Sequence, residues 1–321
     1  MKRRNLLIGG CIGGLAAAHP ALAQTGEFPG KAVRIVVPYA AGSATDALAR
    51  LMAEKLSARW SQPVIIDNRP SGGGNLGLEV VANAAPDGTT LLFMPGPFVH
   101  KALSPELRVD PEKLVPLSVA ATGYSALVAH PGVPAQTVPE LIAYAKANPG
   151  RLNYASQGIG SIAHLAGELF KNMTGIDMVH VPYKGNAPAM SDLLAGRVDA
   201  MFLNLGSALP HVKSGKLKAL GLGSEKRSAA IPELATVAET VPGFVTMVWW
   251  GLFAPPGTPA ALADRISAAA HDALRTPEIA KWMSTNTFEA IGGTPTEAAQ
   301  LLRRDNDRWI KVIRQAGIKA E

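Results

Sequence analysis

The chain has 321 residues and a net charge of +6, from 31 Lys and Arg against 25 Asp and Glu, with a single cysteine. Its basic residues are scattered and form no patch interleaved with aromatic residues, which argues against nucleic-acid binding. A chain of about three hundred residues exceeds one ordinary hydrophobic core, so we expect two lobes.

The first 23 residues have the form of a secretion signal, with a basic start at 2–4, an apolar stretch at 6–18 and a small-residue cleavage motif at 21–23. Cleavage after Ala23 removes three basic residues, which lowers the net charge to +3, and it also removes Cys11. Disulfides, thiolate metal sites and cysteine nucleophiles are then excluded. Twin-arginine export remains open beside the ordinary route, and a lipoprotein cleavage site at Cys11 is the less favoured alternative.

The rest of the sequence alternates apolar runs with segments of helical period, which predicts an α/β protein with mainly parallel sheets. We expect strands at 33–37, 64–67, 90–94, 125–129, 152–155, 178–181, 199–203, 217–221 and 249–254. We expect helices at 47–58, 76–84, 138–147, 162–173 and 187–195, and two or three more after residue 259. Asn186 is the expected N-cap of the helix at 187–195. The pattern leaves open whether the lobes are consecutive or one is inserted in the other.

Two glycine-containing turns join an expected strand to an expected helix, one at 38–46 and one at 155–161. A helix that starts after such a turn points unpaired N–H groups outward, and these groups favour an anion. In the first turn the spacing of Ser43 and Asp46 predicts a capping box. Asp46 would repel an anion, so contacts should come from backbone N–H groups, Ser43 and Thr45. The two turns suggest a cleft that holds a carboxylate between two lobes.

Other motifs have ordinary alternatives. The glycines at 72–74 fit neither a P-loop nor a dinucleotide-binding motif. The seven histidines are dispersed without ligand-pair spacing, so no metal site is expected. Ser161 and His164 could be read as nucleophile and base of a hydrolase, but their spacing favours a capping serine and a locally bonded histidine. The pair Trp249-Trp250 is more typical of core or hinge packing than of ligand stacking.

Several segments in chain order resemble the Bug-type solute receptors of tripartite tricarboxylate transporters, a family of periplasmic binding proteins. The resemblance is carried by the segments 37–50, 68–77, 154–164, 181–185, 196–199, 217–220 and 250–255. One departure is that many relatives have two glycines where this chain has Gly42-Ser43. The substitution either changes the shape of the ligand site or adds one hydrogen-bond donor.

The resemblance implies a two-lobe, type II Venus-flytrap fold with the second lobe inserted in the first. The first lobe would comprise residues 24–123 and 223–321, and the second lobe residues 124–222. The ligand contacts carried over from the family are Tyr39, Ala41, Ser43, Thr45, Gly74, Gly96, Ser156, Gly160, Ser161, His164 and Tyr183, with Asn204 placed to reach the far end of the ligand.

The function implied is that of a monomeric periplasmic receptor that delivers a small organic carboxylate to integral-membrane transporter subunits and uses no cofactor. A receptor for an ATP-driven transporter or a sensor kinase is the nearest alternative. A periplasmic serine hydrolase that uses Ser161 and His164 is the alternative from another class.

Overall fold

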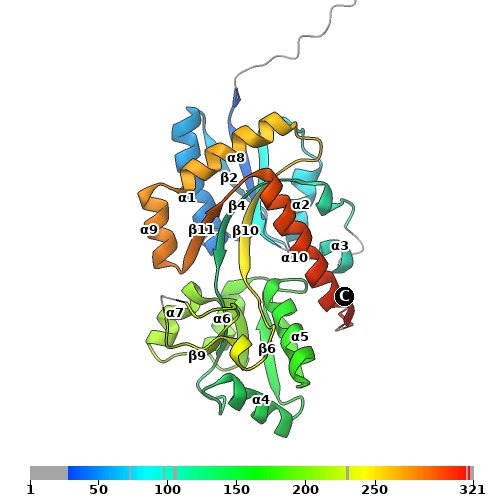
Figure 1. The fold of residues 1–321 in the computed structure, drawn as a ribbon, viewed down its shortest axis with the longest axis vertical. Helices are drawn as coiled ribbons and strands as arrows, with labels where there is room; N and C mark the ends of the chain where they lie inside the picture. Colours follow the sequence, from blue (N-terminus) through cyan, green and yellow to red (C-terminus); the bar gives the residue numbers. More distant parts are fainter. Residues whose placement is uncertain are drawn as a thin grey trace, which may run out of the picture.

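The computed structural model describes residues 28–71, 74–96, 98–103, 107–228, 231–315 and 317–318. Figure 1 shows two lobes, one above the other, each built around its own β-sheet. The predicted secretion signal and its cleavage site lie outside the described residues. In the described part of the chain, no helix combines the length and the apolar character needed to cross a membrane.

The upper lobe is built on a six-stranded sheet in the order β11-β4-β10-β3-β1-β2. Its strands come from both ends of the chain: β1 Val33–Val37, β2 Val64–Asn68, β3 Thr90–Pro95, β4 Val115–Gly123, β10 Val248–Ala254 and β11 Phe288–Gly292. The helices are α1 Ala44–Trp60, α2 Asn75–Ala82, α3 His100–Leu103, η2 Pro111–Lys113, α8 Ala260–Leu274, α9 Pro277–Thr285 and α10 Pro295–Gln315. We call this unit the first lobe.

The lower lobe contains a five-stranded sheet in the order β7-β6-β8-β5-β9. Its strands come from one continuous part of the chain: β5 Ser125–Ala129, β6 Leu152–Ser156, β7 Met178–Pro182, β8 Ala200–Asn204 and β9 Lys218–Leu222. The helices are α4 Val138–Ala147, α5 Ile162–Thr174, α6 Asn186–Leu194 and α7 Leu205–Lys213, and the short η3 Val237–Glu239 lies against β9. This second lobe therefore lies, in sequence, between two parts of the first, as the α/β prediction with an inserted lobe requires.

The prediction of mainly parallel sheets is wrong. The pairs β1–β2, β1–β3, β6–β7 and β6–β8 are parallel, but β10 runs antiparallel to both β3 and β4, and β5 runs antiparallel to both β8 and β9. The strands β4, β5, β9 and β10 flank the crossings between lobes, and β11 also runs antiparallel to β4. Each crossing reverses the strand direction within the sheet that it enters.

Other elements also differ from the sequence-based expectation. The strands β4 and β11 and the helix α7 were not predicted, and α7 contains Pro210, which weakens its helical pattern. Asn186 is the first residue of α6 and not its N-cap, which is Gly185 with a φ of 122°. Glycine reaches this backbone conformation without the strain that an asparagine would meet.

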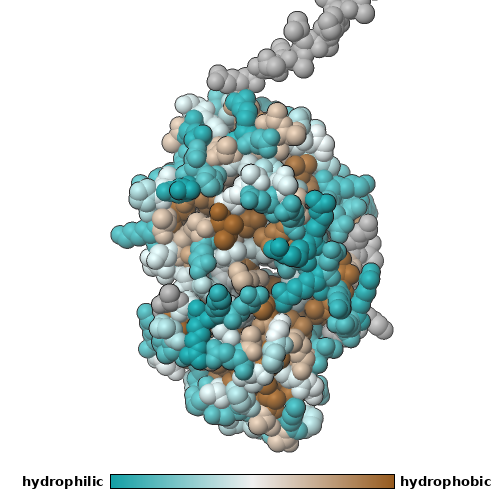
Figure 2. All heavy atoms as spheres, in the orientation of Figure 1, coloured by the Kyte–Doolittle hydropathy of each residue, from teal (hydrophilic) through white to brown (hydrophobic). Residues whose placement is uncertain are grey.

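Two segments of the first lobe also pack on the second. Val99 and Leu103 belong to the hydrophobic core of the second lobe, together with Trp309 and Ile313 from α10. Figure 1 shows α10 running from the upper lobe down towards α5, and the space-filling view shows the two lobes in contact (Figures 1 and 2). The lobes are thus joined by packed side chains as well as by the crossing strands.

Candidate functional site

The 38–46 turn connects the end of β1 to the start of α1. Ser43 is the N-cap of α1, and its Oγ accepts a hydrogen bond from the backbone N–H of Asp46 at 3.2 Å. Gly42 has a φ of 83°, which lets the chain reverse immediately before the cap. The predicted capping interaction of Ser43 is confirmed, but the Asp46 carboxylate does not return to the N–H of Ser43, as a full capping box would require.

The carboxylate of Asp46 accepts hydrogen bonds from inside the turn and from its surroundings. Its donors are the N–H of Gly42, the Nδ2 of Asn68 and the Nε of Arg50, each at 2.9 Å. The side chain is buried, and burial alone would raise its pKa, but the hydrogen bonds from Arg50, Gly42 and Asn68 outweigh burial and lower the pKa. The negative charge of Asp46 is therefore compensated locally, and the N–H of Gly42 is not available to a ligand.

Other donors of this turn remain unused. No hydrogen bond between described residues uses the backbone N–H of Ala41, Ala44 or Thr45. The Oγ of Ser43 accepts a bond, but its hydroxyl proton has no acceptor among the described residues. The phenol of Tyr39 likewise forms no hydrogen bond there, and desolvation raises its pKa, so it stays a proton donor. These are the donors that the first lobe can offer an anion.

The 155–161 turn precedes α5 and has the same construction. Ser161 is the N-cap of α5, its Oγ accepts from the N–H of His164 at 3.4 Å, and its hydroxyl donates to the carbonyl of Gly158 at 2.6 Å. The N–H of Gly160 donates to Nδ1 of His164 at 3.2 Å. The N–H groups of residues 162–163 have no acceptor among the described residues and remain unused.

A stack of three rings lies behind this turn. His164 stacks on His180 with ring centroids 4.2 Å apart, and His180 stacks on Tyr154 at 4.9 Å. Ser156 is fully buried and contacts Nε2 of His180 at 2.7 Å, while the Tyr154 hydroxyl donates to Glu168 at 2.7 Å. The sequence showed His180 only as one of the dispersed histidines, although it lies directly beside Tyr154 in the β6–β7 ladder.

Burial keeps both histidines neutral. Desolvation lowers the pKa of His164, and it lowers the pKa of His180 to about 3. Because Nδ1 of His164 accepts a hydrogen bond from Gly160, the neutral ring must carry its proton on Nε2. The second lobe therefore places a neutral N–H donor directly behind its turn, and the nearby Glu168 carboxylate is paired with Lys171 at 2.8 Å.

The Ser–His arrangement that a hydrolase would require is not formed. The Ser161 hydroxyl donates to the carbonyl of Gly158, and Nδ1 of His164 is occupied by the N–H of Gly160. A serine nucleophile needs its own hydroxyl bonded to the base. The geometry thus supports the capping role of Ser161.

The two helix starts border one apolar cluster. Tyr39 and Ala44 from the first lobe and Ile162, the first residue of α5, all pack against the core cluster of the first lobe. On the other side of the turn, Cδ1 of Leu103 lies 3.2 Å from where a Cβ on Gly160 would stand. The starts of α1 and α5 therefore both lie at the junction of the lobes.

Trp250 lies between the 38–46 turn and Asn204 and extends this junction. Its Nε1 donates to the hydroxyl of Thr45 at 2.9 Å, and its Cζ3 lies 3.1 Å from the position of a Cβ on Gly123. The Nδ2 of Asn204 lies 2.6 Å from that same position. A buried indole N–H needs an acceptor, which is the signal in the sequence that could have pointed to this contact.

Packing accounts for two of the predicted glycine contacts. A Cβ on Gly96 would overlap the ring of Trp249, and a Cβ on Gly74 would lie 3.3 Å from the Pro38 side chain. The N–H of Gly74 donates to the carbonyl of Ser71 at 3.1 Å. Both glycines thus allow close packing, Gly74 beside the 38–46 turn and Gly96 beneath an indole.

Tyr183 and Ser156 have partners of their own. The Tyr183 hydroxyl donates to Asp192 at 2.7 Å, and Asp192 also pairs with Arg197. The Ser156 hydroxyl oxygen accepts from the N–H of Gly158 at 3.0 Å. Among the described residues these side chains therefore stabilise the second lobe, although the backbone of Tyr183 runs beside Gly158.

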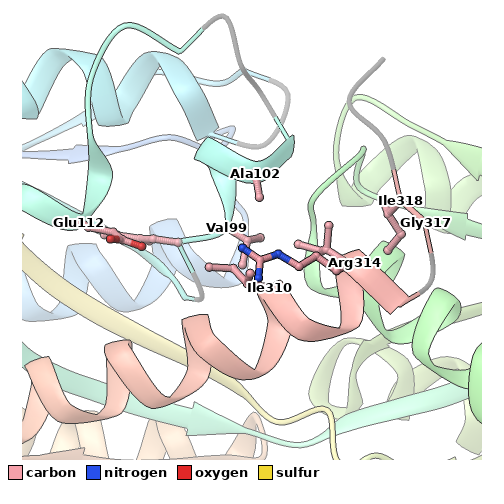
Figure 3. A pocket seen from close by; sticks show the side chains of 9 residues that line it. Val99, Ala102, Glu112, Ile310, Arg314, Gly317 and Ile318 are labelled. Atoms are coloured by element: carbon pink, nitrogen blue, oxygen red, sulfur yellow. The ribbon is translucent and has the colours of Figure 1, made fainter.

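Two cavities lie away from the turns. One, of about 470 Å³, lies between α3 and the end of α10, where Val99 and Ala102 face Ile310 and Arg314 (Figure 3). The other, of about 310 Å³, lies beside the crossing strands near Tyr124. Neither is lined by residues of the 38–46 or 155–161 turns. Neither cavity therefore joins the two turns.

Comparison with known proteins assigns the chain to a family. Residues 48–318 match the family model described as tripartite tricarboxylate transporter family receptor. Protein BugT of Bordetella pertussis is 33% identical, over 99% of this chain and 99% of its own. Rpa4515 of R. palustris with adipate is 34% identical, with a TM-score of 0.85 over 92% of this chain and 100% of that chain.

A further solved structure agrees with this assignment. MatC of Rhodopseudomonas palustris with bound malate is 32% identical, with a TM-score of 0.82 over 89% of this chain and 100% of that chain. The two-lobe α/β fold expected from the sequence is thereby confirmed. The chain belongs to the Bug-type receptors of the tripartite tricarboxylate transporter family.

Proposed function

We propose that this chain is a periplasmic receptor that binds a small organic carboxylate between its lobes and delivers it, chemically unchanged, to a tripartite tricarboxylate-type membrane transporter. The observation that carries the proposal is that the starts of α1 and α5, one from each lobe, border one apolar cluster and retain unused N–H groups among the described residues. The adipate of Rpa4515 and the malate of MatC are themselves carboxylates, which supports the same ligand class here.

Binding and closure are coupled in this proposal. One helix N-terminus favours an anion by about 0.3–1 kcal/mol, and by up to about 2 kcal/mol in a partly buried site. Neither turn alone therefore holds a carboxylate tightly. Closure brings the second set of donors to the ligand and excludes water, so the ligand shifts the equilibrium towards the closed form.

The predicted contact residues divide into two roles. Direct donors to the ligand are the hydroxyls of Tyr39, Ser43 and Thr45, the N–H of Ala41 and, in the second lobe, the Nε2–H of His164. The other predicted contact residues hold these donors in place; they are Gly74, Gly96, Ser156, Gly160, Ser161 and Tyr183. Asn204 is assigned to the far end of the ligand.

Export and partnership complete the proposal. Residues 1–23 act as the signal, and the mature receptor works as a monomer. The lobe boundaries are at 123/124 and 222/223, with Val237, Val241 and Phe244 returning to pack on the second lobe. Its partners are the integral-membrane subunits of the transporter. An ATP-driven transporter or a sensor kinase is the alternative partner, and genes for small and large membrane subunits beside its own gene would separate these cases.

The test is isothermal titration calorimetry of the purified mature chain against mono-, di- and tricarboxylates, with a sugar and a divalent metal ion as controls. We expect at least one carboxylate to bind. If none binds while the sugar or the metal ion does, the proposal is wrong.

A variant pair locates the site. Ser43→Gly removes the hydroxyl donor but keeps an acceptable helix cap, and it should weaken binding about tenfold, the value of one good hydrogen bond. Thr137→Ala removes the N-cap of α4, far from the junction, and should lower stability without changing affinity. Equal affinity loss in both variants would place the site elsewhere.

A further inference from the structure

Asn204 occupies a helix N-cap without capping. It ends β8 and precedes α7 with φ −61° and ψ 131°, a normal capping conformation, yet its side chain accepts no bond from the α7 backbone. Asparagine is among the best N-cap residues because its oxygen satisfies a free N–H of the first turn. At this position the side chain makes no capping hydrogen bond, although its Oδ1 lies beside Gly206 in the first turn of α7.

The carboxamide of Asn204 is buried and unpaired. Neither its Nδ2 nor its Oδ1 has solvent exposure or a hydrogen-bond partner among the described residues. Glycines leave room around it, since a Cβ on Gly123 would lie 2.6 Å from Nδ2 and a Cβ on Gly206 would lie 3.0 Å from Oδ1. Buried amides are nearly always hydrogen-bonded, so an amide with both ends unpaired requires an explanation.

The first lobe contributes a similar group to this junction. The backbone carbonyl of Asn286 contacts Gly206, and Phe288 pairs with Gly123 in the β11–β4 ladder. Thr287, between them, is buried with a φ of 58°, and its Oγ1 has no partner among the described residues. A β-branched residue with positive φ is strained, and such strain clusters at functional sites.

Figure 1 shows α7 of the lower lobe directly beneath the connection between α9 and β11 of the upper lobe (Figure 1). The unpaired groups therefore lie where the lobes meet, on the side of Trp250 opposite to Thr45. A ligand whose carboxylate rests on the turns would extend past Trp250 towards Asn204.

We propose that Asn204 determines specificity for the far end of the ligand and selects a neutral group that both donates and accepts a hydrogen bond, such as a hydroxyl or a carboxamide. The proposal rests on the carboxylate-receptor function above. A second carboxylate would satisfy Nδ2, but it carries no proton for Oδ1 and would place negative oxygen against it.

The start of α7 attracts any acceptor oxygen. What distinguishes the ligands is whether their far end can donate a hydrogen bond to Oδ1 of Asn204, as a hydroxyl or a carboxamide can. An unsubstituted alkyl end leaves both amide atoms unpaired, and a diacid leaves one. The expected order of affinity is therefore ω-hydroxy acid or ω-amide first, then diacid, then unsubstituted acid.

The test is calorimetry with two sets of acids matched in length. The four-carbon set is butanoate, 4-hydroxybutanoate, succinamate and succinate. The six-carbon set is the corresponding series of hexanoate, 6-hydroxyhexanoate, adipamate and adipate. In the set that fits, we expect the hydroxy acid and the amide to bind about tenfold more tightly than the unsubstituted acid and more tightly than the diacid. The variant Asn204→Leu, of similar volume, should bind all four members within about threefold of one another.

Two controls keep folding and function apart. Asn148→Leu removes a local amide bond to the carbonyl of Tyr144 in the same lobe, and it should leave the order of affinities unchanged. Ligand-free Asn204→Leu should melt no lower than the wild type, because it loses only an unpaired buried amide. A lower melting temperature would show a structural role for the amide and overturn the inference.

The remaining outcomes separate the two proposals. The inference fails and the receptor function stands in three cases. These are that the members of a set all bind the wild type with equal affinity, that the diacid binds most tightly, or that the preference for the hydroxy acid and the amide persists in Asn204→Leu. If no member of either set and no other carboxylate binds the wild type, the receptor function fails and the inference with it.

Discussion

The substitution Asp46→Asn tests whether the charge of Asp46 holds the 38–46 turn together. The side chain is 3% exposed, and its carboxylate accepts from Gly42, Asn68 and Arg50. An asparagine is isosteric but offers one oxygen in place of two. Its NH2 group must then face one of the three donors, and the other bonds lose their charge assistance.

The expected loss follows from these contacts. The bond from Gly42 falls from a charge-assisted to a neutral one, which costs about 1 kcal/mol, and the clash with Asn68 costs about as much. The Arg50 side chain is 52% exposed, so its ion pair adds little. We therefore expect the free energy of unfolding to fall by about 2 kcal/mol at pH 7.

Tryptophan fluorescence is suited to the measurement because the five tryptophans lie on elements of the first lobe. Urea unfolding at pH 7 gives the difference between wild type and Asp46→Asn. The folded pKa of Asp46 is lowered, so the stability from its ionised form is present above about pH 4 and is lost as the pH falls through the folded value. The difference should therefore shrink below pH 4.

Asp264→Asn is the matched control, since it removes the same charge from an exposed position on α8 of the same lobe. It should change the free energy of unfolding by no more than about 0.5 kcal/mol. An Asp46→Asn chain as stable as this control, or a difference that persists undiminished at pH 3, would refute the reasoning.

Two other predictions concern packing and protonation. Gly96→Ala should lower the free energy of unfolding by about 2 kcal/mol, because its Cβ would overlap the Trp249 ring, and an unchanged thermal melt would contradict that packing. Burial lowers the pKa of His180 to about 3, so the unfolded chain takes up the proton first as the pH falls. Between pH 6 and pH 4 the wild type should therefore lose stability faster than His180→Gln, by up to about 1.4 kcal/mol per pH unit; parallel urea midpoints would argue against it.

The sequence predicted best those elements whose signal is local. The strand β5 and the helix α4 have the predicted bounds, because a short apolar run and a capped amphipathic segment carry their own pattern. The strand β4 was missed because Pro116 and small residues interrupt its apolar pattern, and its bulged pairing with β10 depends on a segment distant in the chain. The antiparallel pairs were missed for the same reason, since strand direction depends on where the chain crosses between lobes.

For the site, the sequence identified both turns but not which of their donors are already used. Gly160 is a predicted ligand contact, and its N–H is already bonded to His164. Tyr183 is another predicted contact, and its hydroxyl already bonds Asp192. Side-chain orientation at the ends of parallel strands depends on neighbouring helices, which a single motif does not encode.

The two turns nevertheless follow one local rule. In each, a glycine N–H bonds the side chain four residues on, Asp46 in the first lobe and His164 in the second, and the intervening serine caps that same residue. Gly-Ser-x-x-Asp and Gly-Ser-x-x-His therefore form the same local hydrogen-bonding motif, and they differ in the charge of the last side chain.

Because of this difference in charge, the two turns should contribute differently to anion binding. The first turn carries a carboxylate that Arg50 and Asn68 compensate, whereas the second carries a neutral imidazole whose Nε2–H bonds no described residue. In the proposed site, a ligand carboxylate would meet a neutral imidazole at α5, whereas the turn before α1 already contains an anion. The second lobe should therefore supply most of the anion affinity, and the first lobe, with its three hydroxyls, most of the geometric selection that closure completes.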